Sequence, residues 1–305
     1  MSFTKLSWES GLPRTVLVIK KINDKSIVPD FVTLIDWLIN TEHLNVVVES
    51  KVLKEKTLRT NSTFYNLKED LLMLNKKNID SVDLIMTLGG DGTLLYTASL
   101  FVGPMPPVVP FYHGSLGFLT PHKFQNYQEI VSNVISGKSD LTVRSRLTCD
   151  LSDDGMEKTL VMNEVVISRN PSASMSSIDL HMDGQFVTSF LGDGLMLSTS
   201  TGSTAYAASV GSSLVHPSVD GILVVPINSH SLSSRPVLVP AGVELRVSVS
   251  PSNRDDSVQC SFDGRGQKQL NKGQSLTITT SDHHVPCVAA KDPIVRAGHF
   301  LVMES

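Results

Sequence analysis

The sequence has few cysteines, and their number and spacing exclude two classes of small domain. The 305 residues include three, Cys149, Cys260 and Cys287, which lie far apart. An odd number of widely spaced cysteines excludes a disulfide framework and a zinc knuckle, and it fits a reducing compartment. His283 and His284 lie near Cys287, but no further ligand pair has the spacing of a metal site, so we interpret this segment as a polar turn.

Long apolar runs are also absent. No run approaches the length of a membrane span, and residues 1–14 lack the charged, apolar and cleavage regions of a secretory signal. These residues contain Lys5 and Arg14 among several serines, but also Glu9, and they show no arginine-rich amphipathic pattern. We expect a cytoplasmic location, and a mitochondrial location is the alternative.

The chain has no excess of positive charge. Lys and Arg number 26 against 30 Asp and Glu, which gives a formal net charge of −4 at pH 7. A nucleic-acid-binding protein would favour a basic face that neutralises phosphates, so we expect neither nucleic acid nor a membrane as a partner. With 41% hydrophobic residues the chain can bury the core of one large domain or of two ordinary ones.

The first part of the chain alternates strand-like and helical segments. This order predicts an α/β domain over residues 1–140, with a parallel sheet covered on both faces and ligands beyond the carboxyl ends of its strands. Residues 289–305 lose the strand pattern that precedes them and are candidates to complete this domain. The expected strands are 16–19, 46–48, 84–88 and 108–111, and the expected helices are 31–39, 68–74, 93–101 and 124–135.

After residue 140 the pattern changes to short strands separated by turns. Asp154-Gly155 and Asp183-Gly184 each stand between two strand-like runs, which is a hairpin signal. Residues 141–288 are therefore predicted to form a β-rich antiparallel domain. Arg144 and Arg146 alternate at its start, which is typical of one solvated strand face, and contact with phosphates is the alternative.

A glycine-rich turn at residues 89–92, Gly-Gly-Asp-Gly, joins an expected strand to an expected helix. Such turns bind phosphate, because glycines let backbone N–H groups approach the oxygens and the helix directs its positive end at them. The turn lacks the Gly-Lys-Ser/Thr of a P-loop, and Leu95 occupies the third glycine position of a dinucleotide fingerprint. Two interpretations of Asp91 remain open here, a helix N-cap or part of a ligand site.

A second candidate segment is dense in hydroxyl groups. Residues 198–204 contain six Ser or Thr residues and precede a small-residue helix with Tyr206. Hydroxyls and helix-start N–H groups suit a ligand with ribose and phosphate oxygens, whereas a helix cap would explain one or two of them. Asn163 and Glu164 interrupt an apolar run, so at least one of them is expected to be buried and to need a partner, unless the run is a turn or an edge strand.

Six motifs together resemble the NAD kinase family in order and approximate spacing. They are LGGDGTLL, GSLGFLT, NEVVISR, DGLMLSTSTGSTAY, HSLSSRP and SFDG, and they extend from about residue 83 to residue 264. The glycine turn alone also occurs in diacylglycerol and sphingosine kinases, and a related turn occurs in phosphofructokinases, but the later motifs do not. The resemblance implies a two-domain fold and ATP-dependent phosphorylation of the adenosine ribose 2′-hydroxyl of NAD to give NADP.

The resemblance also implies roles for residues at these positions. Asp91 would be the general base that takes the proton of the 2′-hydroxyl, and Mg²⁺, whose ligands the sequence does not give, would accompany the phosphates of ATP. The remaining residues would bind substrates. Gly89, Gly90, Gly92 and Thr93 would accommodate phosphates; Asn163 and Glu164 would hold ribose hydroxyls or the nicotinamide side; Asp193 would approach the nicotinamide half; Thr201, Thr204, Ala205, Tyr206 and Ser209 would line the adenine and carboxamide pockets, with Phe118 packing nearby.

Three positions depart from the family pattern. Ser200 and Ser229 stand where most members have proline, and Ser234 replaces an aromatic residue. Losing two prolines removes backbone pre-organisation but deletes no group with a chemical role.

The sequence fits two rival functions less well than it fits an NAD kinase. A lipid or sphingoid-base kinase would need an apolar groove, whereas STSTGSTAY supplies hydroxyls. A non-catalytic NAD(P) sensor would tolerate loss of Asp91, which is present. The resemblance implies a homo-oligomer, a dimer or tetramer, with NAD(H) and ATP as small-molecule partners.

Overall fold

The computed structural model describes residues 4–8, 11–151, 158–171, 174–231 and 233–290. The chain divides into two compact units. The first comprises Met1–Leu100, Met105–Val143 and Val285–Ser305, and the second comprises Phe101–Pro104 and Arg144–His284. Within the described ranges no helix combines the length and hydropathy needed to cross a membrane.

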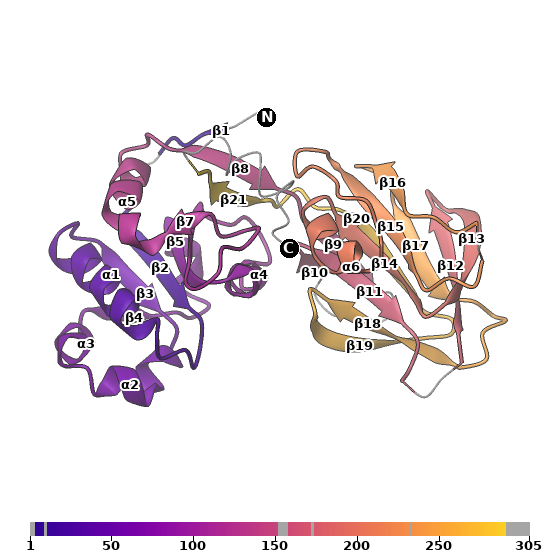
Figure 1. The fold of residues 1–305 in the computed structure, drawn as a ribbon, viewed down its shortest axis with the longest axis horizontal. Coiled ribbons are helices and arrows are strands. Elements are labelled where there is room, and N and C mark those ends of the chain that lie inside the picture. Colours follow the sequence, from indigo (N-terminus) through magenta and orange to yellow (C-terminus); the bar gives the residue numbers. More distant parts are fainter. Residues whose placement is uncertain (1–3, 9–10, 152–157, 172–173, 232, 291–305) are drawn as a thin grey trace. The chain divides into compact units, whose positions relative to one another are not determined.

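The first unit is built on a nine-stranded sheet with the strand order β1-β8-β21-β6-β5-β2-β3-β4, in which β7 also pairs with β6 (Figure 1). Strands β2 to β6 pair in parallel, whereas β1 and β8 are antiparallel, so the predicted parallel sheet is confirmed. The strands are β1 (Thr4–Lys5), β2 (Thr15–Lys20), β3 (Asn45–Val48), β4 (Leu71–Met73), β5 (Leu84–Gly89), β6 (Val108–Tyr112), β7 (His122–Lys123), β8 (Asp140–Arg144) and β21 (Val285–Val288).

Both faces of the central strands are buried. Val16 and Val18 of β2 enter a core cluster with residues of α1, α3 and α5, whereas the intervening Leu17 and Ile19 point to the other face and are also fully buried. Burial on both faces explains why these strands are near-continuous apolar runs. The helices are α1 (Val28–Asn40), α2 (Lys56–Arg59), α3 (Ser62–Leu67), α4 (Asp91–Ser99) and α5 (Tyr127–Ile135), with 3₁₀ turns η1 (Val52–Lys54), η2 (Ile79–Ser81) and η3 (Phe124–Asn126).

The predicted helix at 68–74 is wrong. The helix of this region, α3, ends at Leu67, and residues 71–73 form β4, which pairs in parallel with β3. An apolar run this short does not distinguish a helix from a strand, and here the exposed edge of β3 decides between them. The chain later returns to this unit at Val285 through β21; residues 291–305 of the predicted return lie outside the described part of the chain.

The second unit contains two six-stranded antiparallel sheets, as the turn-rich sequence predicts. Their orders are β10-β9-β20-β17-β12-β13 and β16-β15-β14-β11-β18-β19. The strands are β9 (Leu147–Leu151), β10 (Thr159–Val161), β11 (Glu164–Ser168), β12 (Ser176–Met182), β13 (Gln185–Gly192), β14 (Gly194–Thr199), β15 (Gly221–Ile227), β16 (Val237–Pro240), β17 (Leu245–Val249), β18 (Ser257–Phe262), β19 (Arg265–Asn271) and β20 (Ser275–Thr280).

Strand β15 is buried along its whole length because both of its faces are covered. Ile222 and Val224 enter the core shared by the two sheets. Leu223 and Val225, on the other face, pack with Ala207 of the short helix α6 (Tyr206–Ser209). The hydroxyl-rich segment, which includes the 3₁₀ turn η4 (Thr201–Thr204), is therefore attached to the outer face of the second sheet.

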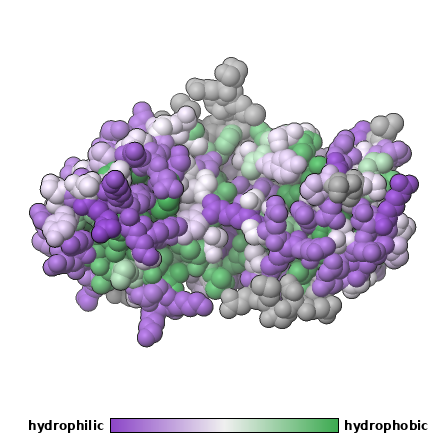
Figure 2. Space-filling model, turned by 90° about the horizontal axis from the view of Figure 1, so that it is seen from below, coloured by the Kyte–Doolittle hydropathy of each residue, from purple (hydrophilic) through white to green (hydrophobic). Residues whose placement is uncertain are grey.

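Hydrophilic and hydrophobic residues both reach the surface, as Figure 2 shows for one face. The large exposed hydrophobic side chains of the second unit include Phe186 of β13 and Val237 of β16, which expose 59% and 54% of their area. Both belong to edge strands of their sheets. Scattered exposed apolar residues are ordinary in folded proteins.

Arg146 is buried, so neither interpretation from its sequence pattern, a solvated strand face or a phosphate ligand, is correct. It is 1% exposed, and its guanidinium donates to the backbone carbonyls of Phe101 at 2.8 Å, Gly103 at 2.7 Å and His283. Burial lowers the pKa of Arg146 to about 10, so the group is charged at neutral pH. Arg146 therefore holds the backbone of two segments at the border of the second unit. One is the short segment Phe101–Pro104, and the other is the end of the unit at His284.

Arg146→Met should lower the free energy of unfolding by about 3 kcal/mol, because buried carbonyls lose their donors. Urea unfolding followed by circular dichroism measures this loss. The control Arg254→Met removes an exposed arginine of the same unit and should change stability by less than about 0.5 kcal/mol. Equal stabilities of the two variants would contradict the structural role of Arg146.

Candidate active site

The strand order of the first unit reverses between β2 and β5. From β2 the chain proceeds through β3 and β4 on one side, and then through β5 and β6 on the other. In open α/β sheets such a switch point creates a crevice beyond the carboxyl ends of the two strands, where ligands bind. Here β2 ends at Lys20 and β5 ends at Gly89, so the glycine turn lies at the switch point.

The glycine turn leads directly into α4. Gly90 is the N-cap in an extended conformation, and Asp91 is the first helical residue, with no side-chain capping bond. The interpretation of Asp91 as the helix cap is therefore wrong. Gly89 has φ +156°, and a Cβ there would lie 2.2 Å from Thr93 Oγ1, so only glycine fits this position.

The carboxylate of Asp91 binds the loop that carries the GSLGFLT motif. It accepts the backbone N–H groups of Phe118 and Leu119, each at 3.0 Å, and the Thr120 hydroxyl at 3.3 Å. A Cβ on Gly117 would lie 2.2 Å from Asp91 Oδ1, so the loop can approach this closely only with glycine. Two motifs that are 27 residues or more apart in the sequence thus meet at one carboxylate.

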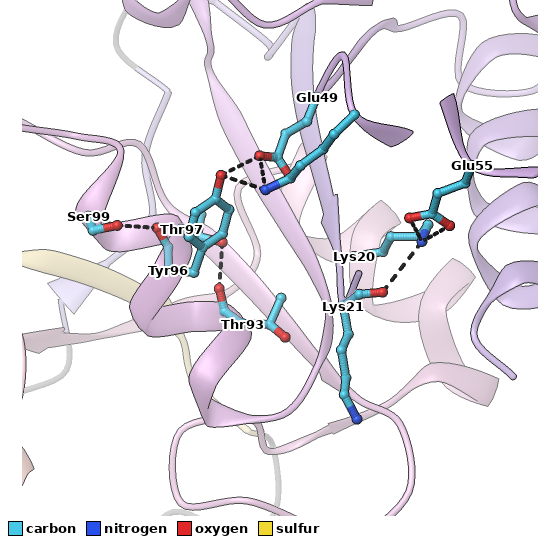
Figure 3. A network of polar contacts seen from close by, with 9 residues as sticks. Lys20, Lys21, Glu49, Glu55, Thr93, Tyr96, Thr97 and Ser99 are labelled. Atoms are coloured by element: carbon cyan, nitrogen blue, oxygen red, sulfur yellow. Dashed lines mark hydrogen bonds and ion pairs between the residues drawn. The ribbon is translucent and has the colours of Figure 1, made fainter. Parts of the chain in front are cut away.

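Helix α4 is also anchored at its middle. Tyr96 donates its hydroxyl to Glu49 Oε1 (Figure 3). The Lys51 ammonium lies 2.8 Å from both groups and 4.1 Å from the centre of the Tyr96 ring. Burial, then the hydrogen bond to Glu49, raises the pKa of Tyr96, so the phenol stays protonated. Thr97 donates to the carbonyl of Thr93 at 2.8 Å. The contacts of Tyr96 with Glu49 and Lys51 fix α4 to the segment that follows β3, and with it the position of Asp91.

In the second unit an aspartate organises the Asn163-Glu164 segment. Asp263 stands in the β18–β19 turn with φ +49°, and its half-buried carboxylate accepts the backbone N–H groups of Met162 and Asn163 at 2.8 Å and of Glu164 at 3.0 Å. Desolvation raises the pKa of Asp263, and these hydrogen bonds act against that rise. Asp263 belongs to the SFDG motif.

Asn163 and Glu164 are both 7% exposed, and each carries a buried oxygen with no hydrogen-bond partner within the described chain, Asn163 Oδ1 and Glu164 Oε2. Such oxygens are costly unless a ligand or water donates to them. Burial, and secondarily the charge of Asp263, raises the pKa of Glu164 from 4.5 to about 7. At neutral pH this carboxyl can therefore accept a hydrogen bond and, when protonated, donate one.

Several hydroxyls of the 198–204 segment bind backbone carbonyls. Ser198 donates to Asn163 at 3.1 Å, Thr199 to Met162 at 2.7 Å, and Ser203 to Ser200 at 2.7 Å. The number of hydroxyls, which suggested a ligand in the sequence, is thus explained in part by the turn itself. The Thr201 hydroxyl lies 3.4 Å from the Arg144 guanidinium.

Asp193 lies apart from these residues within its unit. It precedes β14, whereas Thr201 follows the end of this strand, roughly 20 Å away at 3.3 Å per residue. Its carboxylate binds the Arg169 guanidinium at 2.7 Å and the Asn228 amide at 2.9 Å. The bond from Asn228, followed by that from Arg169, lowers the pKa of Asp193, so it is ionised at neutral pH.

Two family models match the chain in succession. The ATP-NAD kinase N-terminal domain matches residues 16–139, and the ATP-NAD kinase C-terminal domain matches residues 162–290. The chain belongs to the NAD kinase family. The expectation from the six motifs is therefore confirmed.

Individual NAD kinase relatives agree with this assignment. "Probable NAD kinase 1" of Oryza sativa subsp. japonica is 44% identical over 300 residues, which are 94% of this chain and 55% of the relative. "ATP-NADH kinase YEF1" of Saccharomyces cerevisiae is 35% identical, over 90% of this chain and 60% of the relative. The chain thus spans somewhat more than half the length of these curated relatives.

Solved NAD kinase structures share the fold. Yeast NADH kinase complexed with NADH superimposes with a TM-score of 0.86 and 31% identity, covering 95% of this chain and 87% of that one. An NAD kinase from Archaeoglobus fulgidus in complex with ATP gives a TM-score of 0.70 at 20% identity, covering 94% and 98%, and it supports the fold alone. The predicted fold class is confirmed.

The predicted site residues of this family member fall into separate groups. In the first unit, Asp91 connects the glycine turn to Phe118 through the backbone of the latter, while the Phe118 side chain is half-buried. In the second unit, Asn163 and Glu164 lie beside the start of η4, and Tyr206 is 43% exposed. The remaining predicted residues of η4 and α6 mainly stabilise their own turns: the hydroxyls of Thr204 and Ser209 donate to the carbonyls of Thr201 and Tyr206, and Ala205 is the residue between η4 and α6.

Sequence reasoning assigned no role to Asp263, Glu49 or Tyr96. A local signal for Asp263 is present in the sequence: Asp263-Gly264 is an Asp-Gly hairpin turn within the SFDG motif. The contact between Glu49 and Tyr96 joins positions 47 residues apart, and no local pattern predicts it. No group of three or more His, Cys, Asp or Glu in the described ranges could hold a metal ion.

Two glycine substitutions in the first unit should have opposite effects on stability. Gly117→Ala places a Cβ against the Asp91 carboxylate and should cost about 1–3 kcal/mol. In Gly92→Ala, in the first turn of α4, the added Cβ meets no atom within 4 Å. This variant should raise the free energy of unfolding by about 0.5–1 kcal/mol. Thermal or urea unfolding distinguishes them, and a neutral Gly117→Ala would contradict the tight packing of the loop on Asp91.

The raised pKa of Glu164 predicts a pH-dependent stability. Between about pH 4.5 and 7 the unfolded chain loses this proton before the folded chain does, so the contribution of Glu164 to stability falls as pH rises through this window and is constant above it. Relative to Glu164→Gln, the wild type should lose up to about 3 kcal/mol between pH 4.5 and 8. Carboxyl NMR should show Glu164 titrating near pH 7; a midpoint near 4.5 would contradict this prediction.

Proposed function

We propose that this chain is an NAD kinase that transfers the γ-phosphate of ATP to the adenosine ribose 2′-hydroxyl of NAD or NADH. The observation that carries the proposal is Asp91, an oriented carboxylate in a glycine turn at the switch point of a parallel sheet. Relatives covering nearly the whole chain are named NAD kinases and NADH kinases. A carboxylate at a phosphate-binding turn suits a reaction in which a hydroxyl must be deprotonated as it attacks a phosphate.

Asp91 would act as the general base. The backbone N–H groups of Phe118 and Leu119 orient its carboxylate, and Oδ2 accepts only one of these bonds among those the structure shows, which leaves room for the ribose hydroxyl. As the 2′-oxygen forms its bond to the γ-phosphorus, the bond to the ADP oxygen breaks and the hydroxyl proton passes to Asp91. Because the carboxylate is a weak base, positioning supplies much of the rate.

The phosphates of ATP would occupy the glycine turn. The phosphates would lie against Gly89, Gly90 and Gly92; an added Cβ would meet no atom within 4 Å at Gly90 and Gly92, which leaves space for a ligand. Thr93 is buried against the turn, and the first turn of α4 directs its positive end towards the phosphates. Mg²⁺, when bound, would offset the phosphate charge. Since the described residues hold no acidic or histidine cluster, the phosphates themselves would supply most of its ligands.

The dinucleotide would be held by the second unit. The unpartnered oxygens of Asn163 and Glu164 suit ribose hydroxyls, which can donate to both. Asp193, at the opposite end of β14, would contact the nicotinamide half. The other proposed contacts, for the adenine and carboxamide groups, are Thr201, Thr204, Ala205, Tyr206 and Ser209 of the second unit; Phe118 of the first unit is a further proposed contact.

The two rival functions find less support. A lipid kinase would share the glycine turn, but the second family model, over residues 162–290, is that of NAD kinases. A sensor without turnover would not require a carboxylate oriented by two N–H groups. We also propose a homo-oligomer, a dimer or tetramer, for which the exposed apolar residues of β13 and β16 are candidate contacts, and a cytoplasmic location with a mitochondrial one as the alternative.

Asp91→Asn should reduce turnover by roughly 10²–10⁴-fold, the factor expected for a lost general base, while NAD binding is retained. Steady-state kinetics and calorimetric NAD titration measure the two effects separately. Because the substitution also changes a partner of the Phe118 loop, Thr120→Val serves as the control: it removes a loop contact to Asp91 and keeps the base. Unchanged turnover in Asp91→Asn would show that Asp91 is not the general base.

A further inference from the structure

The two lysines at the end of β2 lie beside the glycine turn in different environments. Lys20 is 1% exposed, and its ammonium donates to both carboxylate oxygens of Glu55 at 2.7 Å. Lys21 exposes 60% of its side chain, and its ammonium lies 3.3 Å from Asp24. Figure 3 shows the Lys20 ammonium against Glu55 and the Lys21 side chain extending away from that pair. The charge of Lys20 is thus neutralised inside the fold, whereas that of Lys21 reaches the surface.

The backbone places Lys21 directly at the switch point. Its N–H donates to the carbonyl of Leu88 at 2.9 Å, which ties the end of β2 to the end of β5. A Cβ built on Gly89 would lie 3.3 Å from the Cβ of Lys21. The long, flexible side chain of Lys21 therefore starts beside the turn that we propose for the phosphates of ATP.

A cation is needed at this turn. The phosphates of a nucleotide carry several negative charges, and Asp91 adds another in the same place. The start of α4 supplies only a partial positive charge. A lysine ammonium is a compact point charge that commonly binds phosphate, and it costs little to redirect while it remains solvated.

Asp24 keeps the Lys21 ammonium near the turn without burying it. Its carboxylate accepts the Ser26 hydroxyl at 2.5 Å and the Ser26 N–H at 3.1 Å. The hydrogen bond from the Ser26 hydroxyl is the main cause that lowers the pKa of Asp24, so the carboxylate stays ionised and available to Lys21. An exposed ion pair of this kind contributes little to stability, so a phosphate can displace it.

We propose that Lys21 is a catalytic residue that leaves Asp24 and binds the transferring phosphate of the donor nucleotide. This inference rests on the proposed function, because it takes ATP as the ligand of the glycine turn. Lys20, one position earlier, does not share the role, since its ammonium is already enclosed by Glu55.

The test compares Lys21→Met, Lys21→Arg and Lys25→Met in the full chain. Lys25 is an exposed lysine of the same loop, so its substitution controls for the loss of one positive charge. Calorimetry measures the Kd of Mg-ATP, and kinetics with NAD measures turnover. Lys21→Met should weaken Mg-ATP binding about tenfold and lower kcat/KM for ATP by roughly 10²-fold, as expected for a lost phosphate contact, with KM for NAD changed less than about twofold.

Lys21→Arg should recover most of the loss, and Lys25→Met should match the wild type. Urea unfolding should show that Lys21→Met is folded, because the side chain is exposed. Mg-ATP binding by Lys21→Met equal to that of the wild type, or equal losses in Lys21→Met and Lys21→Arg, would overturn the proposal. If the wild type phosphorylates neither NAD nor NADH while Mg-ATP binding still depends on Lys21, the proposed acceptor is wrong and the role of Lys21 stands.

Discussion

The hydrogen bonds between the Asp91 carboxylate and the backbone of the Phe118–Leu119 loop are the interaction on which the first unit's site depends. The loop closes over Asp91 because Gly117 has no side chain, and α4 starts at Asp91 because Gly89 can adopt its positive φ. Asp91 thereby holds the loop and orients its own carboxylate through the same hydrogen bonds. A residue without a side-chain acceptor at this position would lose both.

The second unit uses the same physical device. Asp263, in a tight turn, accepts three backbone N–H groups and so shapes the segment that contains Asn163 and Glu164. In both units a carboxylate satisfies backbone donors that would otherwise be unpaired. This arrangement places two carboxyl groups close together. Burial, and secondarily the charge of Asp263, therefore raises the pKa of Glu164 to about 7.

Much of this organisation is predictable from the sequence. The features that are not predictable depend on contacts between residues far apart in the chain. The apolar runs around 16–19 and 84–88 and the Asp183-Gly184 turn are local signals, and each predicts the element that forms there, whereas Asp154-Gly155 lies outside the described residues. The helix predicted at 68–74 failed because pairing with β3, a tertiary effect, outweighs the short local pattern. Likewise, the burial of Arg146 and the contact of Tyr96 with Glu49 depend on residues more than 40 positions away, which no local pattern contains.

The site residues divide in the same way. The glycine turn and the Asn163-Glu164 pair were recognised as unusual because each breaks the pattern of its own segment. Five of the six serines and threonines of 198–204 donate to backbone carbonyls, so the turn itself accounts for much of the hydroxyl density in the sequence. A charge or amide that breaks a local pattern therefore separates a candidate ligand site from a self-capped turn more clearly than a large number of polar residues does.

The most direct test is NADP(H) formation by the purified chain with ATP and Mg²⁺, with NAD and NADH compared at equal concentrations. A kinase built on an oriented Asp91 predicts product from at least one acceptor, phosphorylated at the adenosine ribose 2′-hydroxyl, and the ratio of rates gives the preference. No product from either acceptor, in a folded chain that still binds nucleotide, would contradict the assignment.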